Sequence, residues 1–161
     1  MERIGFDNST FNIEYFCDLE TGTVRLLEMN PRLSESHCDL YEKVDGLPDL
    51  KILVDIALGR RPRFPHQEGR FRCAGKFFIR RHEDAVVRRV PDAAERERLA
   101  DAVPGTLVKV HVEEGMRLSH LPNQDSHSFE VADLLIGADD EDELIEKRRR
   151  AAGMLDLDFA A

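Results

Sequence analysis

The chain has 161 residues, of which 42% are hydrophobic and 34% are charged, and its formal net charge at pH 7 is −9. This composition is typical of a globular protein with one domain or two small ones. The negative charge argues against nucleic acid as the main partner. No apolar run approaches the roughly 20 residues of a membrane span, and the first residues lack the apolar core of a signal peptide, so we expect neither.

The cysteines Cys17, Cys38 and Cys73 are odd in number, and none of them belongs to a Cys-x-x-Cys pair. This arrangement favours reduced thiols in the cytoplasm and argues against a zinc site. We expect each cysteine to act as a small buried apolar residue.

Residues 11–17 and 23–29 are rich in aromatic and β-branched residues, and residues 18–22 between them have turn chemistry. These segments predict a β-hairpin. Because side chains alternate across a strand, residues two apart share a face. The expected sets are Asn12, Glu14 and Phe16 in the first strand, and Leu26, Glu28 and Asn30 in the second.

Two carboxylates are predicted to meet across this hairpin. If it closes symmetrically about Thr21, Glu14 lies opposite Glu28 and Asn12 lies opposite Asn30. Like charges directly opposite each other destabilise a sheet, so the pair favours a bound cation, and Mg²⁺ prefers carboxylate and amide oxygens. A one-residue bulge would break this register. From spacing alone, the alternative is an ordinary exposed hairpin with scattered acids.

Two short helices are predicted next. The first spans about residues 36–44 and ends at Gly46, a C-cap residue. Pro48 and Asp49 open the second helix, which stops at Gly59. We expect its apolar stripe to be part of the core; the stripe consists of Leu50, Leu53, Val54 and Ala57.

The later part of the chain contains four predicted strands. Residues 71–80 and 85–90 are expected to pair with each other, and residues 106–112 and 129–136 are two further strands. With the helices, they indicate an α+β fold in which helices flank an antiparallel sheet. Residues 60–69 are the best domain boundary. The expected domains are residues 1–62 and 63–161.

Two more helices complete the pattern. Asp92 and Glu95 form an acidic capping box for a helix that ends near Ala102. The final helix begins with the acidic residues 139–142 and ends with the basic residues 147–150, which matches both ends of a helix dipole. Its expected buried face is Leu144, Ile145, Ala152 and Leu155.

An ordered run of motifs in the first 59 residues resembles the C-terminal half of an ATP-grasp domain. In pattern, the run is most similar to biotin carboxylase and to the large subunit of carbamoyl-phosphate synthetase. The resemblance implies ATP and Mg²⁺ (or Mn²⁺) as cofactors. The motifs are Ile13-Glu14-Tyr15-Phe16, Leu27-Glu28-Met29-Asn30-Pro31-Arg32-Leu33-Ser34, Gly46-Leu47-Pro48, and Leu50 to Gly59.

The resemblance also implies a role for each site residue. Glu14, Glu28 and Asn30 would ligate the Mg²⁺ that bridges the ATP phosphates, so Glu28 would contribute to cofactor binding as well. Arg32 would face an acyl-phosphate or carboxy-phosphate intermediate, as the catalytic residue. Phe16 would form an apolar wall under the adenine.

Beyond residue 70 the resemblance is weaker. Residues 105–158 look like the C-terminal domain of biotin carboxylase, including a polar loop with Asp125-Ser126. The substrate-side arginine of that family has no clean counterpart near residues 72–74, so no biotin or bicarbonate role is carried over. Glu35-Ser36 is nearer the synthetase-like variant. The acceptor substrate therefore stays open.

ATP-grasp chemistry also needs a glycine-rich flap and phosphate-contacting lysines, which precede the metal strands in the family. Ten residues precede the first predicted strand here, and they contain neither. We therefore expect the back half of an ATP-dependent carboxylate–amine ligase or carboxylase, acting on a small-molecule carboxylate. The N-terminal half would belong to a partner chain, or it would have been lost. The alternative is a non-catalytic interaction module or a degenerate fragment derived from the same fold.

Three remaining patterns are less specific. Residues 60–90 hold ten Lys or Arg residues, which would suit an anionic substrate or an acidic neighbour, although most such runs are solvated strand faces. His37 follows the arginine and is a candidate substrate contact, whereas His111, His120 and His127 lack paired ligand spacing and favour surface or core roles. Ser126 lies beside Asp125, but no Gly-x-Ser-x-Gly elbow supports a hydrolase.

Overall fold

The computed structural model describes residues 2–34, 37–122 and 127–160. The predictions that concern Glu35, Ser36, Asp125 and Ser126 lie outside the described residues. Helices and antiparallel strands alternate along the chain, so the predicted α+β class is confirmed. In chain order the elements are η1 (Glu2–Ile4), β1 (Asn12–Asp18), β2 (Thr23–Asn30), α1 (Cys38–Asp45), α2 (Asp49–Ala57), β3 (Cys73–Arg81), β4 (Val86–Arg89), α3 (Ala93–Ala102), β5 (Thr106–Val110), η3 (Leu118–His120), β6 (Phe129–Ala138), α4 (Glu141–Met154) and β7 (Asp158–Ala160).

The strands β1 and β2 form the predicted antiparallel hairpin. Glu14 pairs with Glu28, and Asn12 pairs with Asn30. This register at the open end of the hairpin is as predicted. It follows from the strongly β-forming residues on both sides of a short turn, where Gly22 takes a φ of 67°.

A β-bulge lies just beyond the paired glutamates, on the side of the turn. The register shifts between Glu14 and Tyr15, so that Tyr15 pairs with Leu26 and Leu27 is the extra residue. Paired residues point to the same side of a sheet, so Leu26 lies on the side opposite Glu28. The expectation that these two side chains share a face, and that the hairpin closes symmetrically, is therefore wrong.

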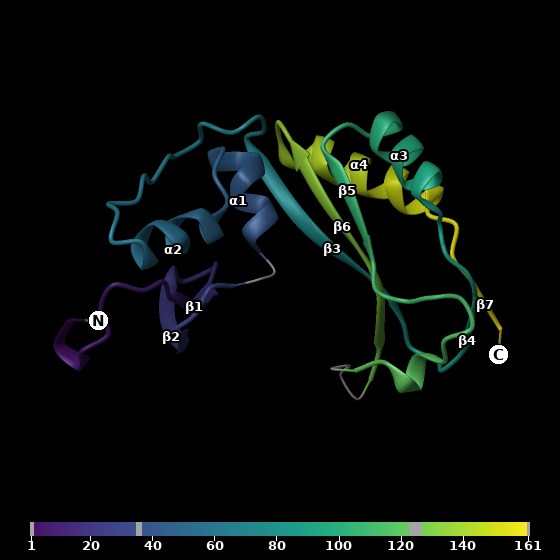
Figure 1. The fold of residues 1–161 in the computed structure, drawn as a ribbon, viewed down its shortest axis with the longest axis horizontal. Helices are drawn as coiled ribbons and strands as arrows, with labels where there is room; N and C mark the ends of the chain where they lie inside the picture. The colour runs from purple at the N-terminus through teal and green to yellow at the C-terminus, as the bar shows by residue number, and fades with distance from the viewer. Residues whose placement is uncertain (1, 35–36, 123–126, 161) are drawn as a thin grey trace.

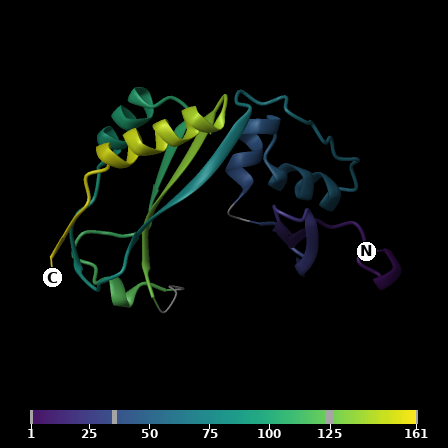
Figure 2. The same cartoon turned by 180° about the vertical axis from the view of Figure 1, so that it is seen from behind.

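A three-stranded sheet in the order β3-β6-β5 forms the centre of the rest of the fold. Helices α3 and α4 cover one of its faces (Figures 1 and 2). Side chains that alternate toward these helices make a dry core. This core contains Leu99, Val103, Leu134, Ile136 and Ala151.

Helix α1 connects the hairpin side of the molecule to this sheet, because it contacts β3 and β6 (Figure 1). Lys43 of α1 donates a hydrogen bond of 2.8 Å from Nζ to the carbonyl of Gly105, and burial lowers the pKa of this lysine. The helix ends, as predicted, at Gly46 with a φ of 77°. Helix α1 also contacts α2, so it joins α2 to the sheet.

The predicted pairing of residues 71–80 with 85–90 is wrong. Strand β3 pairs with β6, whereas β4 pairs with β7 at the C-terminal end of the chain. The carboxylate of Asp84 accepts hydrogen bonds from Arg117 and Ser119, at 2.9–3.0 Å. These bonds hold the connection between β3 and β4 against η3, so the chain turns away from β3 instead of forming a hairpin.

Two buried faces differ from expectation. The apolar stripe of α2 is largely exposed at Leu50 and Val54, so it is not core. Helix α4 continues to Met154, so the basic residues 147–150 lie before its last turn and do not match the C-terminal end of the dipole. On α4, Ile145 is exposed, whereas Ala151 is fully buried. The side of this helix that faces the core carries Leu144 and Ala151, which pack with residues of β6.

Cys17 is exposed, contrary to its expected burial, while Cys38 and Cys73 are partly buried. Burial beside Asp49 raises the pKa of the Cys38 thiol to about 11. This thiol therefore stays protonated near neutral pH and is a poor nucleophile.

Among the described residues, no helix has both the length and the apolar character that crossing a membrane requires.

The capping box of α3 gives a direct test of local stability. The Asp92 side chain accepts from the backbone of Glu95 at 2.8 Å, and the Glu95 side chain accepts from the backbone of Asp92 at 2.9 Å. Asp92→Ala is expected to lower the free energy of unfolding by about 1 kcal/mol, measured by urea denaturation. Asp101→Ala, in the last turn of the same helix, should change it by less than about 0.5 kcal/mol. Equal effects of the two changes would contradict the role of the cap.

Candidate functional site

Four polar side chains of the hairpin converge on one face. The Asn30 amide nitrogen Nδ2 donates to Glu28 Oε1 at 2.7 Å, to Asn12 Oδ1 at 3.1 Å and to Glu14 Oε1 at 3.4 Å. We call these four residues the amide–carboxylate cluster. The sequence predicted that Glu14, Glu28 and Asn30 would come together, and they do.

The amide–carboxylate cluster holds two facing carboxylates whose mutual repulsion is offset by the amide N–H groups of Asn30. Carboxylate and amide oxygens are the ligands that a hard cation such as Mg²⁺ takes. The two ends of an amide are interchanged by a half-turn of the side chain, so Asn30 can offer either a donor or an oxygen. The donor set fits Mg²⁺ or Mn²⁺.

Arg32 lies directly after the cluster. Its backbone N–H donates to the Asn30 carbonyl at 2.9 Å, and its own carbonyl accepts from Asn12 Nδ2 at 3.2 Å. The guanidinium donates to the Leu33 carbonyl at 3.3 Å, and within residues 2–34, 37–122 and 127–160 no carboxylate pairs with it. An arginine that is fixed by its main chain, and whose charge has no carboxylate partner in the described part of the chain, is suited to bind an anion bidentately.

Phe16 lies farther along β1, beyond the bulge. Its ring is 64% exposed. It lines a separate shallow pocket with Asp18, Thr23 and Arg25, and it does not line the pocket of Glu14 and Arg32. The structure therefore does not bring Phe16 together with the other predicted site residues.

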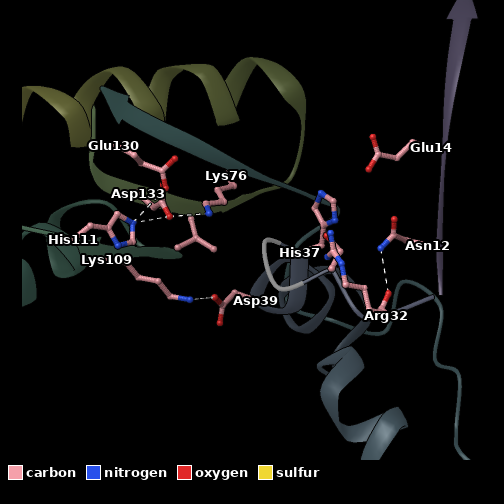
Figure 3. Close-up of a pocket in the computed structure, with 12 residues that line it drawn as sticks. Asn12, Glu14, Arg32, His37, Asp39, Lys76, Lys109, His111, Glu130 and Asp133 are labelled. Carbon is pink, nitrogen blue, oxygen red and sulfur yellow. Dashed lines mark hydrogen bonds and ion pairs between the residues drawn. The ribbon is translucent and has the colours of Figure 1, made fainter. Parts of the chain in front are cut away.

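A pocket of about 490 Å³ has the hairpin on one side and the three-stranded sheet on the other. Figure 3 shows Asn12, Glu14, Arg32 and His37 on the first side. His37, a candidate substrate contact from the sequence, thus lines the pocket. The residues that the sheet side contributes are Lys76, Lys109, His111, Glu130, Asp133 and Leu135.

The sheet side is polar because strand alternation and a second bulge direct charged side chains there. Asp133 pairs with Phe78 and Glu130 pairs with Arg80. Phe78 and Arg80 are two apart on β3, so they share a face, and their partners share it too. The register shift after Ile79 makes this possible, since Glu130 and Asp133 would lie on opposite faces of a regular strand.

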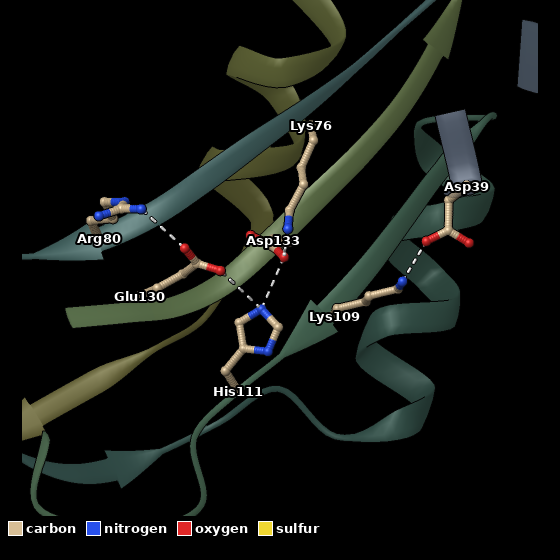
Figure 4. Close-up of polar contacts among 7 residues, drawn as sticks. All are labelled: Asp39, Lys76, Arg80, Lys109, His111, Glu130 and Asp133. Carbon is tan, nitrogen blue, oxygen red and sulfur yellow. Dashed lines mark hydrogen bonds and ion pairs between the residues drawn. The ribbon is translucent and has the colours of Figure 1, made fainter. Parts of the chain in front are cut away.

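Asp133 is the buried centre of this polar face, with a side chain that is 2% exposed. Its Oδ2 atom lies 2.8 Å from Lys76 Nζ and 3.0 Å from His111 Nε2 (Figure 4). Beside it, Glu130 pairs with Arg80 at 3.1 Å and lies 3.6 Å from His111 Nε2. A buried carboxylate of this kind requires such partners.

His111, Glu130 and Asp133 each offer a ligand atom, and these atoms lie within 4.8 Å of one another. The negative charges of the two carboxylates are already balanced by Lys76 and Arg80. A divalent cation would face both of these basic groups, so the geometry favours a hydrogen-bond network over a metal centre here.

The sequence reading placed His111 in a surface or core role and so missed its position in this network. A usable signal was present. His111 follows Lys109 at a spacing of two along an exposed strand face, and Asp133 interrupts the apolar residues 131–136 of β6. Their contact depends on strand order, which the spacing does not contain.

Comparison with known proteins finds sequence relatives of the region that contains the hairpin. Residues 1–63 match the family model described as carbamoyl-phosphate synthase L chain, ATP binding domain. This region is similar to the ATP-grasp enzymes. The carbamoyl phosphate synthase large chain of Xylella fastidiosa is 39% identical over 59 residues, and that of Pseudothermotoga lettingae is 41% identical over 61 residues. These matches cover 37% and 38% of this chain, and 5% of each relative.

Solved structures extend the similarity in fold to almost the whole chain. The biotin carboxylase domain of Hydrogenobacter thermophilus 2-oxoglutarate carboxylase, in complex with MgADP, ADP and bicarbonate, has a TM-score of 0.67 at 21% identity. The match covers 95% of this chain and 32% of that one. Kluyveromyces lactis urea carboxylase has a TM-score of 0.67 at 16% identity, over 95% of this chain and 13% of that one. At these identities the likeness concerns the fold.

Proposed function

We propose that this chain forms the metal-ligand side of an ATP-grasp site that activates a carboxylate as an acyl phosphate, in a carboxylate–amine ligase or a carboxylase. The observation that carries the proposal is the convergence of Glu14, Glu28 and Asn30 beside Arg32, which has no carboxylate partner among the described residues, within the region that matches the ATP binding domain. In this proposal, residues 1–62 are the C-terminal part of the ATP-grasp domain. Residues 63–161 are a biotin carboxylase C-terminal-like region.

Each site residue has a role in this chemistry. Glu14, Glu28 and Asn30 would hold Mg²⁺ or Mn²⁺, which supplies positive charge against the phosphates of ATP. Arg32 would bind the acyl phosphate and stabilise its negative charge. Phe16 would contact the adenine; its exposed ring offers a flat apolar surface, although it lies outside the pocket of the other residues.

The exposed apolar surface of the hairpin and of α2 is evidence that a further protein segment covers the hairpin. Tyr15, Val24 and Leu26 are 55%, 59% and 62% exposed, and Leu50 and Val54 of α2 are exposed as well. A two-stranded hairpin is marginally stable alone, and apolar patches of this kind mark interaction sites. We propose that the covering segment carries the glycine-rich flap and the phosphate-contacting lysines, in the same chain or in a partner, and that the assembly works on a small carboxylate in the cytoplasm.

The same exposed surface also favours a second candidate, a non-catalytic interaction module derived from this fold. Such a module would bind its partner through the apolar side of the hairpin. It would have no use for the cation, so dependence on Mg²⁺ or Mn²⁺ separates the two candidates.

Glu28→Gln tests the metal site in the 161-residue chain itself. We expect Mn²⁺ binding, followed by electron paramagnetic resonance, to weaken by about tenfold or more. Without metal, the melting temperature should stay unchanged or rise, because one of two facing negative charges is removed. Any rise in melting temperature caused by Mg²⁺ with ATP should disappear.

Glu20→Gln is the matched control, since it removes the same charge from the turn of the same hairpin, away from the amide–carboxylate cluster. It should bind Mn²⁺ as the parent does. Undiminished Mn²⁺ binding by Glu28→Gln would remove the basis of the metal site.

A further inference from the structure

His111 and Asp133 form a pair that the metal and phosphate chemistry does not use. His111 Nε2 lies 3.0 Å from the buried Asp133 Oδ2, and both residues line the pocket that Arg32 enters from the opposite side. The His111 side chain is 35% exposed, so the ring is accessible from the pocket while its partner is not. Asp133 is therefore the buried member of the pair, and His111 is the member that a ligand in the pocket can reach.

The position of the proton on His111 follows from its partner. Asp133 Oδ2 also forms an ion pair with the ammonium of Lys76 at 2.8 Å. An ionised carboxylate only accepts hydrogen bonds, so Nε2 carries the proton in the neutral ring. The other nitrogen, Nδ1, then has a free lone pair, and within the described part of the chain no contact engages it.

The charged groups around the ring are paired with one another. Lys76 contacts Asp133, Arg80 contacts Glu130, and Lys109 of β5 contacts Asp39 of α1 (Figure 4). Three cations thus balance three carboxylates. The imidazole is left as the group in this wall that can take up a proton without disturbing an existing ion pair.

We infer that His111, held by Asp133, accepts the proton of an amine nucleophile that attacks the acyl phosphate. The inference rests on the proposed function and narrows it: the acceptor is a primary amine, and the wall contributed by β5 and β6 activates it. Asp133 is the positioning residue, because it fixes the tautomer and the orientation of the ring.

An ammonium group gives one proton to His111 Nδ1, and the resulting amine attacks the carbonyl carbon of the acyl phosphate. The C–N bond forms, the bond between the carbonyl carbon and the phosphate oxygen breaks, and that oxygen leaves with the electron pair. The nitrogen loses a second proton to the departing phosphate, which leaves as hydrogen phosphate. His111 then releases its proton to water.

The test separates acyl-phosphate formation from amine attack. The enzyme assembled with its covering segment is supplied with ATP, Mg²⁺ and a mixture of the common L-amino acids, with and without hydroxylamine. Hydroxylamine is largely unprotonated near pH 7 and traps an acyl phosphate as a hydroxamate without a base, whereas an α-amino group is mostly protonated there. For His111→Gln we expect unchanged hydroxamate formation and a loss of amide formation of about 10²- to 10⁴-fold.

The controls distinguish the possible failures. His120→Gln, which lies outside the pocket, should leave both products unchanged, and added imidazole should partly restore amide formation in His111→Ala. If the parent enzyme forms no hydroxamate, the proposed function itself fails. If the parent does and His111→Gln still forms amide at the parental rate, or loses both products together, the role of His111 is overturned.

A second measurement uses the 161-residue chain alone. Nitrogen-15 spectra of the imidazole should show the neutral His111 ring protonated at Nε2, and the preference should weaken in Asp133→Asn. A neutral ring protonated at Nδ1 would leave no lone pair toward the pocket and would overturn the inference.

Discussion

Arg32→Ala is expected to lower carboxylate-dependent ADP release by about 10²- to 10³-fold in the assembled enzyme. The acyl phosphate carries negative charge that the guanidinium can bind with two parallel hydrogen bonds. The structure leaves this charge unpaired among the described residues while fixing the backbone of Arg32 against Asn30 and Asn12. Coupled measurement of ADP release, with and without the carboxylate, gives the result.

Two further variants define what Arg32 does. Arg32→Lys should recover part of the lost rate, because it keeps the charge but loses the planar fork. Arg63→Ala removes an exposed arginine that already pairs with Glu68, and it should have little effect. Mn²⁺ binding should be unchanged in Arg32→Ala. A rate for Arg32→Ala equal to that of the parent would rule out its role at the acyl phosphate.

Asp133→Ala is expected to lower the free energy of unfolding by about 3–5 kcal/mol. The change removes the partner of Lys76, whose side chain is 18% exposed, and of His111 as well. A charge left buried without its counter-ion is costly, and the lost stability is a large part of the roughly 5–15 kcal/mol that holds a typical domain together. The urea midpoint at constant m-value measures the loss.

A double variant separates the lost partner from the lost packing. Lys76→Met with Asp133→Leu replaces both charges by apolar groups of similar size, so it should recover most of the stability. The Oδ1 atom of Asp133 has no hydrogen-bond partner among the described residues, which adds to the cost of keeping this carboxylate buried. A double variant as unstable as Asp133→Ala would show that the ion pair is not the source of the effect.

Local chemistry made much of the hairpin side predictable. The β-forming residues on both sides of a Gly-containing turn are enough to predict the hairpin itself. Gly46 at the end of α1 and the capping box of Asp92 and Glu95 are likewise short-range signals. In each case the groups that interact are close in the sequence, so few alternative arrangements compete.

The bulge at Leu27 was not predictable in the same way. Either strand can accept one extra residue, and the sequence alone does not rank these registers. Counted from the turn pair of Asp18 and Thr23, a hairpin without the bulge would place Glu14 opposite Leu27. The extra residue Leu27 therefore brings Glu28 opposite Glu14 and leaves Leu26 on the other face. The exposed stripe of α2 was mispredicted for a related reason: periodicity identifies an apolar face but not what covers it.

The sequence by itself determined the hairpin that carries the amide–carboxylate cluster, the position of Arg32 after it, the end of α1 at Gly46 and the cap of α3 at Asp92, because these depend on contacts between near neighbours in the chain. The tertiary structure alone decided that β3 pairs with β6 instead of β4, and that a bulge in β6 turns Glu130 to the side of Asp133. It also decided that His111 meets Asp133 across from Arg32. Such contacts join residues from distant segments, and strand order and sheet register select them from many combinations that the sequence pattern allows equally.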